Sequence, residues 1–553
     1  MPTLHWIGKE KVINHHMDVP FKVLEHAYGF AADASTGSAT DASTGSATDA
    51  TTGTATVQKE ETKSGNKIIH GDNLEALKAL LPEYEGKIKC IYIDPPYNTG
   101  NESWVYNDNV NDPKIKKWLK QVVGIDDLTR HDKWLCMMYP RLKLLEKLLS
   151  KDGVLLISIG DDEVHNLITI CDEIFGEKSH DATFVWKSRT KPTNAGRAKF
   201  RPQKVTEYVL LYSKTNDLLF NTLTGEDKYS YPNNDKDGNF RTTTILTSNL
   251  GTYKRETMRF EIAGYTPSPQ QRWKAGEKII QDLYDNNRLQ FKDGTPMQKV
   301  YDFDNEEINN PLYTIIKQEL TGSAETGKTL LNKYIGKGHG FDTVKPVELL
   351  NYLFEVFSTK DSIILDSFAG SGTTAHAVLN LNKKDGGNRK FILIEMEDYV
   401  ENITAKRVKR IMSGIGEYEG TGGSFDFYEL GQPLFNEDGN LNESVGVEKI
   451  RQYVWYTETQ SGYKLEVMNG EINKTNNSSL ITHHSYLGTH NDTAYYFNYE
   501  KDGVTTLDHA FLATMKTKAE QYVIYADNCL LTKDFMTKHH IIFKKIPRDV
   551  TKF

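Results

Sequence analysis

The sequence lacks long apolar runs and contains little cysteine. No window approaches the roughly eighteen consecutive apolar residues that a membrane-spanning helix needs, and the N-terminus lacks the apolar core of a secretory signal. The four cysteines show neither CxxC pairing nor the spacing of metal ligands. These absences predict a cytoplasmic protein with reduced thiols, no membrane contact and no bound metal. The cysteines are Cys90, Cys136, Cys171 and Cys529.

The length of 553 residues predicts several domains, since one domain takes about 100 to 200 residues. Between residues 34 and 57 the octapeptide ASTGSATD occurs twice and then a third time in degraded form. Gly, Ser, Thr and Ala at this density bury little apolar surface. We therefore expect a flexible linker over 33–57, preceded by an N-terminal arm over 1–32.

Short apolar runs alternate with helical patterns from residue 67 onward, which is typical of a parallel α/β sheet covered on both faces. A polar stretch interrupts the pattern, which indicates a large insertion in one α/β domain, and a small α+β domain follows. The predicted strands are 67–70, 88–93, 154–159, 205–212, 362–365 and 391–394. The predicted boundaries are 58–214 and 336–432 for the α/β domain, 215–335 for the insertion and 433–553 for the C-terminal domain.

The tetrapeptide Asp94-Pro95-Pro96-Tyr97 directly follows the predicted strand 88–93. Two successive prolines can neither continue a strand nor enter a helix interior, so they fix a rigid, extended turn. In open α/β sheets, the carboxyl ends of the strands are where active sites form. Such a turn would hold two acceptors in a fixed relation, the Asp94 carboxylate and the Pro95 carbonyl, with the Tyr97 ring beside them. This arrangement would suit an exocyclic aromatic amine, whose two N–H donors need acceptors.

A second motif, DSFAGSGTTA over 366–375, follows a predicted strand and opens a helix. Gly370, Gly372 and Ala375 satisfy the G-x-G-x-x-G/A pattern in the strand-to-helix context that it requires, where glycine lets the backbone approach a ligand. Glu395 ends the next predicted strand, in a position to accept hydrogen bonds from ribose hydroxyls. The loop alone leaves open whether the ligand is a dinucleotide or a nucleoside cofactor without phosphate.

Together, the tetrapeptide and the glycine-rich loop resemble those of S-adenosylmethionine-dependent DNA amino-methyltransferases of the adenine-N6 type, in the order of the beta group. The longer match over 94–108, with Arg130-His-Asp-Lys-Trp-Leu135, resembles the modification subunits of type III restriction-modification systems. The resemblance implies a Rossmann-like methyltransferase sheet and methyl transfer to N6 of an adenine flipped out of double-stranded DNA. It also implies a homodimer and a helicase-nuclease partner subunit.

The same resemblance implies roles for single residues. Asp94, Pro95, Pro96 and Tyr97 would form the catalytic site, and Lys345 would bind the cofactor carboxylate. The family strand near residue 206 often reads His-Glu-Tyr, whereas this chain has Thr-Glu-Tyr, so no role is assigned there. The other implied cofactor contacts are Asp72, Asp366, Phe368, Gly370, Gly372, Thr373 and Glu395.

The net charge of −8 taken alone disfavours nucleic acid as a partner, but basic residues are concentrated locally. Residues 183–214 contain eight Lys or Arg residues and a single acid. Part of this segment has the composition of a loop, so we expect a basic edge that contacts phosphates. The insertion 215–335 is expected to read base edges. The predicted DNA contacts are Lys187, Arg189, Lys191, Arg197, Lys199, Arg201, Lys204 and Arg272.

Three alternatives remain open. One is a binding module that recognises DNA but has lost catalysis, although the intact tetrapeptide and glycine-rich loop argue against it. A solitary amino-methyltransferase that acts on adenine N6 or cytosine N4, without a restriction partner, would carry the same motifs. The segment from Gly322 to Thr329 also fits the P-loop pattern of an NTPase. However, the residues before it show a helical pattern where a P-loop needs a buried strand.

Overall fold

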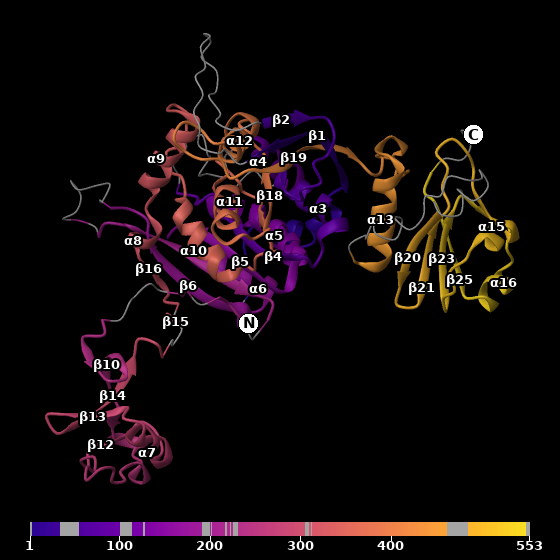
Figure 1. Cartoon of the computed structure of the whole chain (residues 1–553). Coiled ribbons are helices and arrows are strands. Elements are labelled where there is room, and N and C mark those ends of the chain that lie inside the picture. Colours follow the sequence, from indigo (N-terminus) through magenta and orange to yellow (C-terminus); the bar gives the residue numbers. More distant parts are fainter. Residues whose placement is uncertain are drawn as a thin grey trace. The chain divides into compact units, whose positions relative to one another are not determined.

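The computed structural model describes most of the chain as two compact units (Figure 1). The main unit is formed by Met1–Asn221 and Tyr313–Phe553, and the inserted unit by Thr222–Leu312. Among the described helices, none is long and apolar enough to cross a membrane. The described residues are 3–33, 55–99, 113–124, 128–190, 200, 202–215, 218–221, 223–224, 230–304, 309–310, 312–461 and 485–548.

A large sheet with a parallel centre forms the main unit. In the described part of the chain its strand order is β16-β6-β7-β5-β4-β17-β18-β3-β19-β1-β2. β4 pairs in parallel with β5 and β17, and β17 pairs in parallel with β18, so the predicted α/β fold is confirmed. The strands are β1 (Lys22–Ala32), β2 (Ala55–Gln58), β3 (Lys67–His70), β4 (Ile88–Ile93), β5 (Leu149–Ile159), β6 (His180–Lys187), β7 (Thr206–Ser213), β16 (Ile315–Ile316), β17 (Ile363–Asp366), β18 (Lys390–Glu395) and β19 (Gly423–Pro433).

The central strands are buried on both faces, which explains their continuous apolar sequences. On β4, Ile91 and Ile93 belong to the core that includes α3 and α5, whereas Tyr92 contacts Phe354 of α10. Helices therefore cover both faces of the sheet, and loops occupy the strand ends. The helices are α1 (Lys9–Val12), α2 (His15–Asp18), α3 (Asn73–Tyr84), α4 (Pro113–Val122), α5 (Arg130–Leu148), α6 (Val164–Phe175), α8 (Gln318–Thr321), α9 (Ala324–Ile335), α10 (Val347–Phe357), α11 (Thr373–Asp385) and α12 (Lys406–Ser413).

The N-terminal segment corrects the expectation of an arm over 1–32. β1 pairs antiparallel with β19, and Trp6 and Val12 lie in the main core. The paired residues are about 400 positions apart in the chain, as for His26 and Tyr428, so no local sequence signal reveals this pairing. Of the expected linker, residues 34–54 lie outside the described residues, and β2 pairs with β1.

The inserted unit has a small core of its own, centred on Trp273 and Ile280. It is shorter than the predicted insertion 215–335, because β16 pairs with β6 and α9 belongs to the main unit. The polar composition that suggested a longer insertion therefore extends into an edge of the main sheet. Its elements are β8 (Leu223–Thr224), β9 (Asn233–Asp235), β10 (Gly238–Thr244), β11 (Leu246–Ser248), β12 (Gln271–Trp273), α7 (Glu277–Asp285), β13 (Leu289–Lys292), β14 (Thr295–Tyr301) and β15 (Asn309–Asn310).

The C-terminal region is a four-stranded α+β module in the order β20-β21-β23-β25. α13 covers one face through Trp455, in a cluster that also contains Val23 of β1 and Leu434. The elements are α13 (Val447–Thr459), β20 (Tyr486–His490), β21 (Thr493–Phe497), β22 (Thr506–Leu507), α15 (His509–Thr514), β23 (Gln521–Ala526), β24 (Asn528–Cys529), α16 (Lys533–Lys538) and β25 (Ile541–Lys545).

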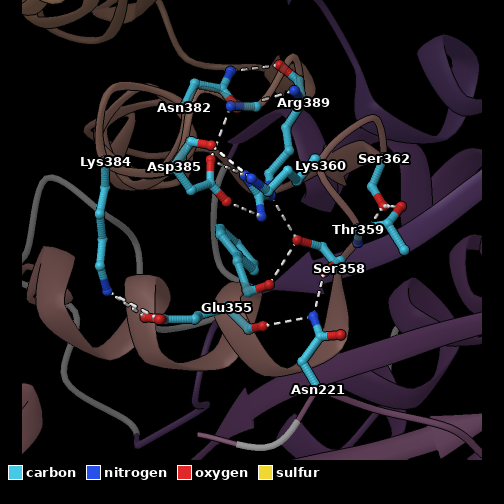
Figure 2. A network of polar contacts seen from close by, with 12 residues as sticks. Asn221, Glu355, Ser358, Thr359, Lys360, Ser362, Asn382, Lys384, Asp385 and Arg389 are labelled. Carbon is cyan, nitrogen blue, oxygen red and sulfur yellow. Dashed lines mark hydrogen bonds and ion pairs between the residues drawn. The ribbon is translucent and has the colours of Figure 1, made fainter. Parts of the chain in front are cut away.

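A polar network joins the ends of α10 and α11 to the residue at which the main unit meets the inserted unit (Figure 2). The buried Arg389 guanidinium pairs with both Asp385 oxygens at 3.0 and 2.9 Å and donates to Ser358 Oγ at 3.0 Å. Asn221 Nδ2 donates to the carbonyls of Glu355 and Ser358, both at 2.9 Å. The network therefore fixes the position of Asn221 on the main unit.

Removing the carboxylate of Asp385 should destabilise the main unit strongly. Arg389 is only 4% exposed, so Asp385→Ala leaves a buried guanidinium without its counter-ion. We expect a loss of about 2 to 4 kcal/mol in the free energy of unfolding, measured by urea denaturation. Glu355→Gln is the control in the same network, since its partner Lys384 is 64% exposed and the loss should stay below about 1 kcal/mol. Equal losses in the two variants would contradict this account of the network.

Candidate active site

Both predicted motifs leave the same edge of the main sheet. The Asp94-Pro95-Pro96-Tyr97 turn follows β4, the glycine-rich loop follows β17, and these two strands are parallel neighbours. Because the carboxyl ends of adjacent parallel strands lie side by side, the two motifs are brought together although they are far apart in sequence.

The Pro-Pro turn is held from several sides. Trp134 Nε1 of α5 donates a hydrogen bond to the Pro96 carbonyl at 2.7 Å. Asn98 adopts a left-handed conformation, with φ 57°, and its amide donates to the Arg130 carbonyl at 3.1 Å. Gly160, just after β5, packs against the Tyr97 ring, where an added Cβ would lie 2.9 Å from Tyr97 Cδ2. Packing therefore fixes both the turn and the aromatic ring.

A lysine lies between two carboxylates beside this turn. Lys345 Nζ is 2.9 Å from each Asp94 oxygen and 3.3 Å from Glu207 Oε2. The ammonium also lies 4.9 Å from the centre of the Tyr97 ring, whose hydroxyl donates to Glu207 Oε2 at 2.9 Å. Asp94, Glu207, Lys345 and Tyr97 thus form one connected group, which we call the Lys345 cluster.

In the Lys345 cluster, burial disfavours the charged form of each group, whereas pairing with opposite charges favours it. Burial raises the pKa of Asp94 above its ordinary value, against the opposing effect of Lys345. Burial also disfavours the charged form of Glu207, but Lys345 and Tyr97 outweigh it and the pKa of Glu207 is lowered. Burial would likewise lower the pKa of Lys345, but the two carboxylates raise it. The charged forms of Lys345 and Glu207 therefore stabilise each other.

The glycine-rich loop is ordered by hydrogen bonds to buried acids. Asp366 accepts from the Phe368 N–H at 3.0 Å and from Thr374 Oγ1 at 2.5 Å. Gly370 has a φ of 52° and Gly372 a φ of 80°, which is backbone geometry that favours glycine. Gly372 precedes α11 as its N-cap residue, and an added Cβ there would lie 3.2 Å from a Thr404 methyl group.

Asp72 and Glu395 flank this loop, but both carboxylates already have protein partners. Glu395 accepts from the backbone N–H groups of Gly370, Met396 and Glu397 at 2.7, 2.9 and 3.1 Å. Asp72 caps α3 by accepting from the N–H groups of residues 74 and 75. Neither side chain lines the pocket next to the loop, so their roles as cofactor contacts stay predictions.

Two pockets adjoin at the Lys345 cluster and share Asp94, Thr343, Val344 and Lys345. We call them the Tyr97 pocket and the loop pocket. The Tyr97 pocket is further lined by Pro95, Tyr97, Thr99, Trp186, Arg189, Glu207 and Ala324. The loop pocket is further lined by Tyr92, Phe341, Leu350, Asp366, Phe368, Ala369, Gly370, Ser371, Thr373 and Thr374.

The structure brings most of the predicted catalytic and cofactor residues to these pockets. Pro96 and Gly372 support the walls without lining them, and Lys345, predicted as a cofactor contact, is paired with Asp94 and Glu207. The predicted contacts that line a pocket are Asp94, Pro95, Tyr97, Lys345, Asp366, Phe368, Gly370 and Thr373.

The predicted DNA contacts are more dispersed. Arg189 lines the Tyr97 pocket, and the exposed Lys187 ends β6. Lys204 pairs with Asp161 at 3.2 Å, and Arg272 of the inserted unit donates to the Ser248 carbonyl at 3.3 Å. Lys191, Arg197, Lys199 and Arg201 lie outside the described residues.

Glu207, Trp186 and Arg407 are among the residues around the pockets that sequence reasoning missed. Glu207 is the charged residue of β7, next to a run of apolar and aromatic residues, and this was a usable signal. Trp186 is opposite it on β6. No pattern in the sequence indicated that Arg407 belongs to the site. It is fully buried and donates to Ser371 Oγ and Thr373 Oγ1 at 2.9 and 3.0 Å, so it supports the loop from behind, and burial lowers its pKa to about 10.

The P-loop-like segment has a different role. Ser323 caps α9 in a capping box with Thr326, and α8 precedes it where a P-loop needs a buried strand. Lys328 pairs with Asp342 at 3.0 Å. The segment is the beginning of a surface helix.

Comparison with known proteins agrees with this geometry. Residues 88–406, more than half of the chain, match the family described as DNA methylase. The type III restriction-modification enzyme StyLTI Mod subunit of Salmonella typhimurium is 33% identical over 372 residues, covering 62% of this chain and 54% of the relative. The EcoPI Mod subunit of Escherichia phage P1 is 32% identical over 391 residues, covering 62% and 59%.

The type II methyltransferase M.KpnI of Klebsiella pneumoniae is 29% identical over 357 residues, covering 60% of this chain and 81% of the relative. The chain thus spans less than two thirds of the length of the two type III relatives. The family match covers β4, the Pro-Pro turn, β7, Lys345 and the glycine-rich loop. By this match the chain belongs to the DNA methylase family.

Proposed function

We propose that the chain transfers a methyl group from S-adenosylmethionine to N6 of an adenine in double-stranded DNA. The observation that carries the proposal is that the Tyr97 pocket and the loop pocket meet at Asp94 and Lys345. A methyl donor in one pocket and an aromatic amine in the other would face each other at that junction. Holding two reactants in such a geometry is worth several kcal/mol of the barrier.

The loop pocket has the chemistry that S-adenosylmethionine needs. Phe341, Leu350 and Phe368 supply apolar walls for an adenosine base, and Asp366 supplies a carboxyl group. The positive φ of Gly370 allows close approach of the backbone. Once bound, S-adenosylmethionine supplies a methyl group that its sulfonium already activates.

The Tyr97 pocket suits a base taken out of the DNA stack. Tyr97 and Trp186 provide aromatic surface, and stacking on such rings returns about 1 to 3 kcal/mol per base against the cost of flipping. Asp94 and the Pro95 carbonyl are acceptors for the two N–H groups of the amine, which draws its lone pair out of conjugation. Asp94 is also placed to hold the proton that the amine releases.

We assign target recognition to the inserted unit and propose that the chain is the modification subunit of a type III restriction-modification system. This would make it a homodimer that works with a helicase-nuclease subunit. The support is the similarity to the StyLTI and EcoPI Mod subunits, together with the basic residues after β6, Lys187 and Arg189.

A second candidate is a solitary DNA amino-methyltransferase. The similarity to M.KpnI favours it, since the match extends over 81% of that type II enzyme. The two candidates share the chemistry and differ in partner. Cleavage of unmethylated DNA when a cognate helicase-nuclease subunit is added distinguishes them, because only the type III candidate supports it.

Replacing Asp94 should abolish most methyl transfer without preventing cofactor binding. Asp94→Ala removes an acceptor for the target amine, for which we expect a rate loss of about 10²- to 10³-fold. The assay is transfer of labelled methyl groups from S-adenosylmethionine to DNA, followed by analysis of the methylated nucleoside. Retained activity in Asp94→Ala would contradict the mechanism, and a product at cytosine N4 would contradict the choice of base.

The affinity for S-adenosylmethionine should rise with pH around neutrality. Burial raises the pKa of Asp366 to about 7, and its protonated form does not attract a sulfonium cation. If only the ionised form binds tightly, the affinity rises about tenfold between pH 6 and pH 8. Isothermal titration calorimetry at constant ionic strength measures this change.

Asp366→Asn is the matched variant for this prediction. It should bind more weakly at about pH 8 and lose this part of the pH dependence. S-adenosylhomocysteine, whose sulfur is uncharged, should show a weaker pH dependence with the wild-type protein. The same pH dependence in wild type and Asp366→Asn means that another group is responsible.

A further inference from the structure

Glu207 lines the Tyr97 pocket, although no role was predicted for it from the sequence. It is on β7, directly opposite Trp186 of β6 in the antiparallel register, so both side chains point to the same face of the sheet. Both line the pocket, and the Glu207 side chain is only 15% exposed. A carboxylate that is buried to this extent needs partners to remain charged.

Two of the partners of Glu207 are members of the Lys345 cluster, and the side chain of Ser188 is a further hydrogen-bond partner. Its Oε2 atom accepts from the Tyr97 hydroxyl at 2.9 Å and lies 3.3 Å from Lys345 Nζ. Lys345 is also 2.9 Å from both oxygens of Asp94. One ammonium therefore pairs with two carboxylates. When both carboxylates are ionised, the three side chains of Asp94, Glu207 and Lys345 carry a net charge of −1.

This charge balance bears on the reaction. If Lys345 had Asp94 as its sole counter-ion, the pair would be neutral and Asp94 would attract the target amine weakly. With Glu207 present, one unit of negative charge remains next to the amine. Such a fixed charge stabilises the positive charge that the amine nitrogen acquires as its bond to the methyl carbon forms.

We propose that Glu207 is a positioning residue for methyl transfer, which balances the charge of Lys345 and orients Tyr97 so that the negative charge of Asp94 acts on the target amine. This inference rests on the proposed function of the same site. In this inference Glu207 does not contact the target amine. Its charge affects the rate of methyl transfer through its contacts with Lys345 and Tyr97.

Glu173, like Glu207, is paired with one tyrosine hydroxyl and one lysine ammonium, so it provides a matched control. Glu173 of α6 accepts from the Tyr139 hydroxyl at 3.0 Å and pairs with Lys9 Nζ at 2.7 Å. Its side chain is 18% exposed, close to the 15% of Glu207, but it lines neither of the two pockets. Loss of its charge should therefore have only a structural effect.

The test compares Glu207→Gln with Glu173→Gln in steady-state methyl transfer to DNA. Glutamine keeps the shape and an acceptor for the tyrosine hydroxyl and removes the charge. We expect kcat to fall about 10- to 100-fold in Glu207→Gln, as for the loss of one electrostatic contact, with KM for DNA and Kd for S-adenosylmethionine within about twofold of wild type. Glu173→Gln should shift Tm by about as much as Glu207→Gln does, but its kcat should stay at the wild-type value.

The pH profile separates a charge effect from a structural one. The groups that face Asp94 are Lys345, Glu207, Tyr97, Tyr92 and Asp366, and the charge of Glu207 raises the pKa of Asp94. The acidic limb of the kcat profile should therefore move to lower pH in Glu207→Gln and stay in place in Glu173→Gln. Tyr97→Phe, which keeps the ring and the carboxylate, should lower kcat less than Glu207→Gln.

The outcomes distinguish this inference from the function on which it rests. Absence of methyl transfer by the wild-type chain would overturn the proposed function. An active wild type with an equally active Glu207→Gln variant would overturn the role of Glu207 alone. An unmoved acidic limb, or equal losses in Tyr97→Phe and Glu207→Gln, would overturn the charge argument.

Discussion

The candidate site depends on one positive charge, the Lys345 ammonium, held between carboxylates from different parts of the sheet. Asp94 follows β4, Glu207 is on β7, and Lys345 comes 251 positions after Asp94, just before α10. The ion pairs therefore tie together three chain segments that share no local sequence signal. Because the same residues form the junction of the two pockets, the interaction that stabilises the site also determines where two reactants would meet.

Much of the fold and the two principal motifs could be predicted from the sequence because their signals are local. A buried strand followed by two prolines, and a strand followed by a glycine-rich turn, can each be read within about ten residues. Parallel strands then bring the two turns to one edge. The same reasoning could not give Glu207 its role, because that role comes from the antiparallel register of β7 with β6. It also could not find the pairing of β1 with β19.

The position of a side chain in the sequence did not fully predict its role in the site, because its role also depends on its hydrogen-bond and ion-pair partners. Glu395 ends β18, as predicted, and Asp72 lies between β3 and α3, yet each carboxylate accepts hydrogen bonds from nearby backbone N–H groups. Lys345 was expected to serve the cofactor, and the structure pairs it with Asp94 and Glu207. A position at a strand end places a side chain near the site. What the side chain can bind there depends on whether its donors and acceptors are already paired with other protein groups.

The inserted unit begins and ends in the short ladder of β8 and β15, where residues 223 and 224 pair with 310 and 309. Its two chain ends are therefore neighbours, as in domains that tolerate insertion and exchange. A different unit with similarly spaced ends could be inserted between the same two main-unit segments, Met1–Asn221 and Tyr313–Phe553. On the proposed assignment of target recognition to the inserted unit, sequence preference and chemistry would belong to separate parts of the chain and could change independently in evolution.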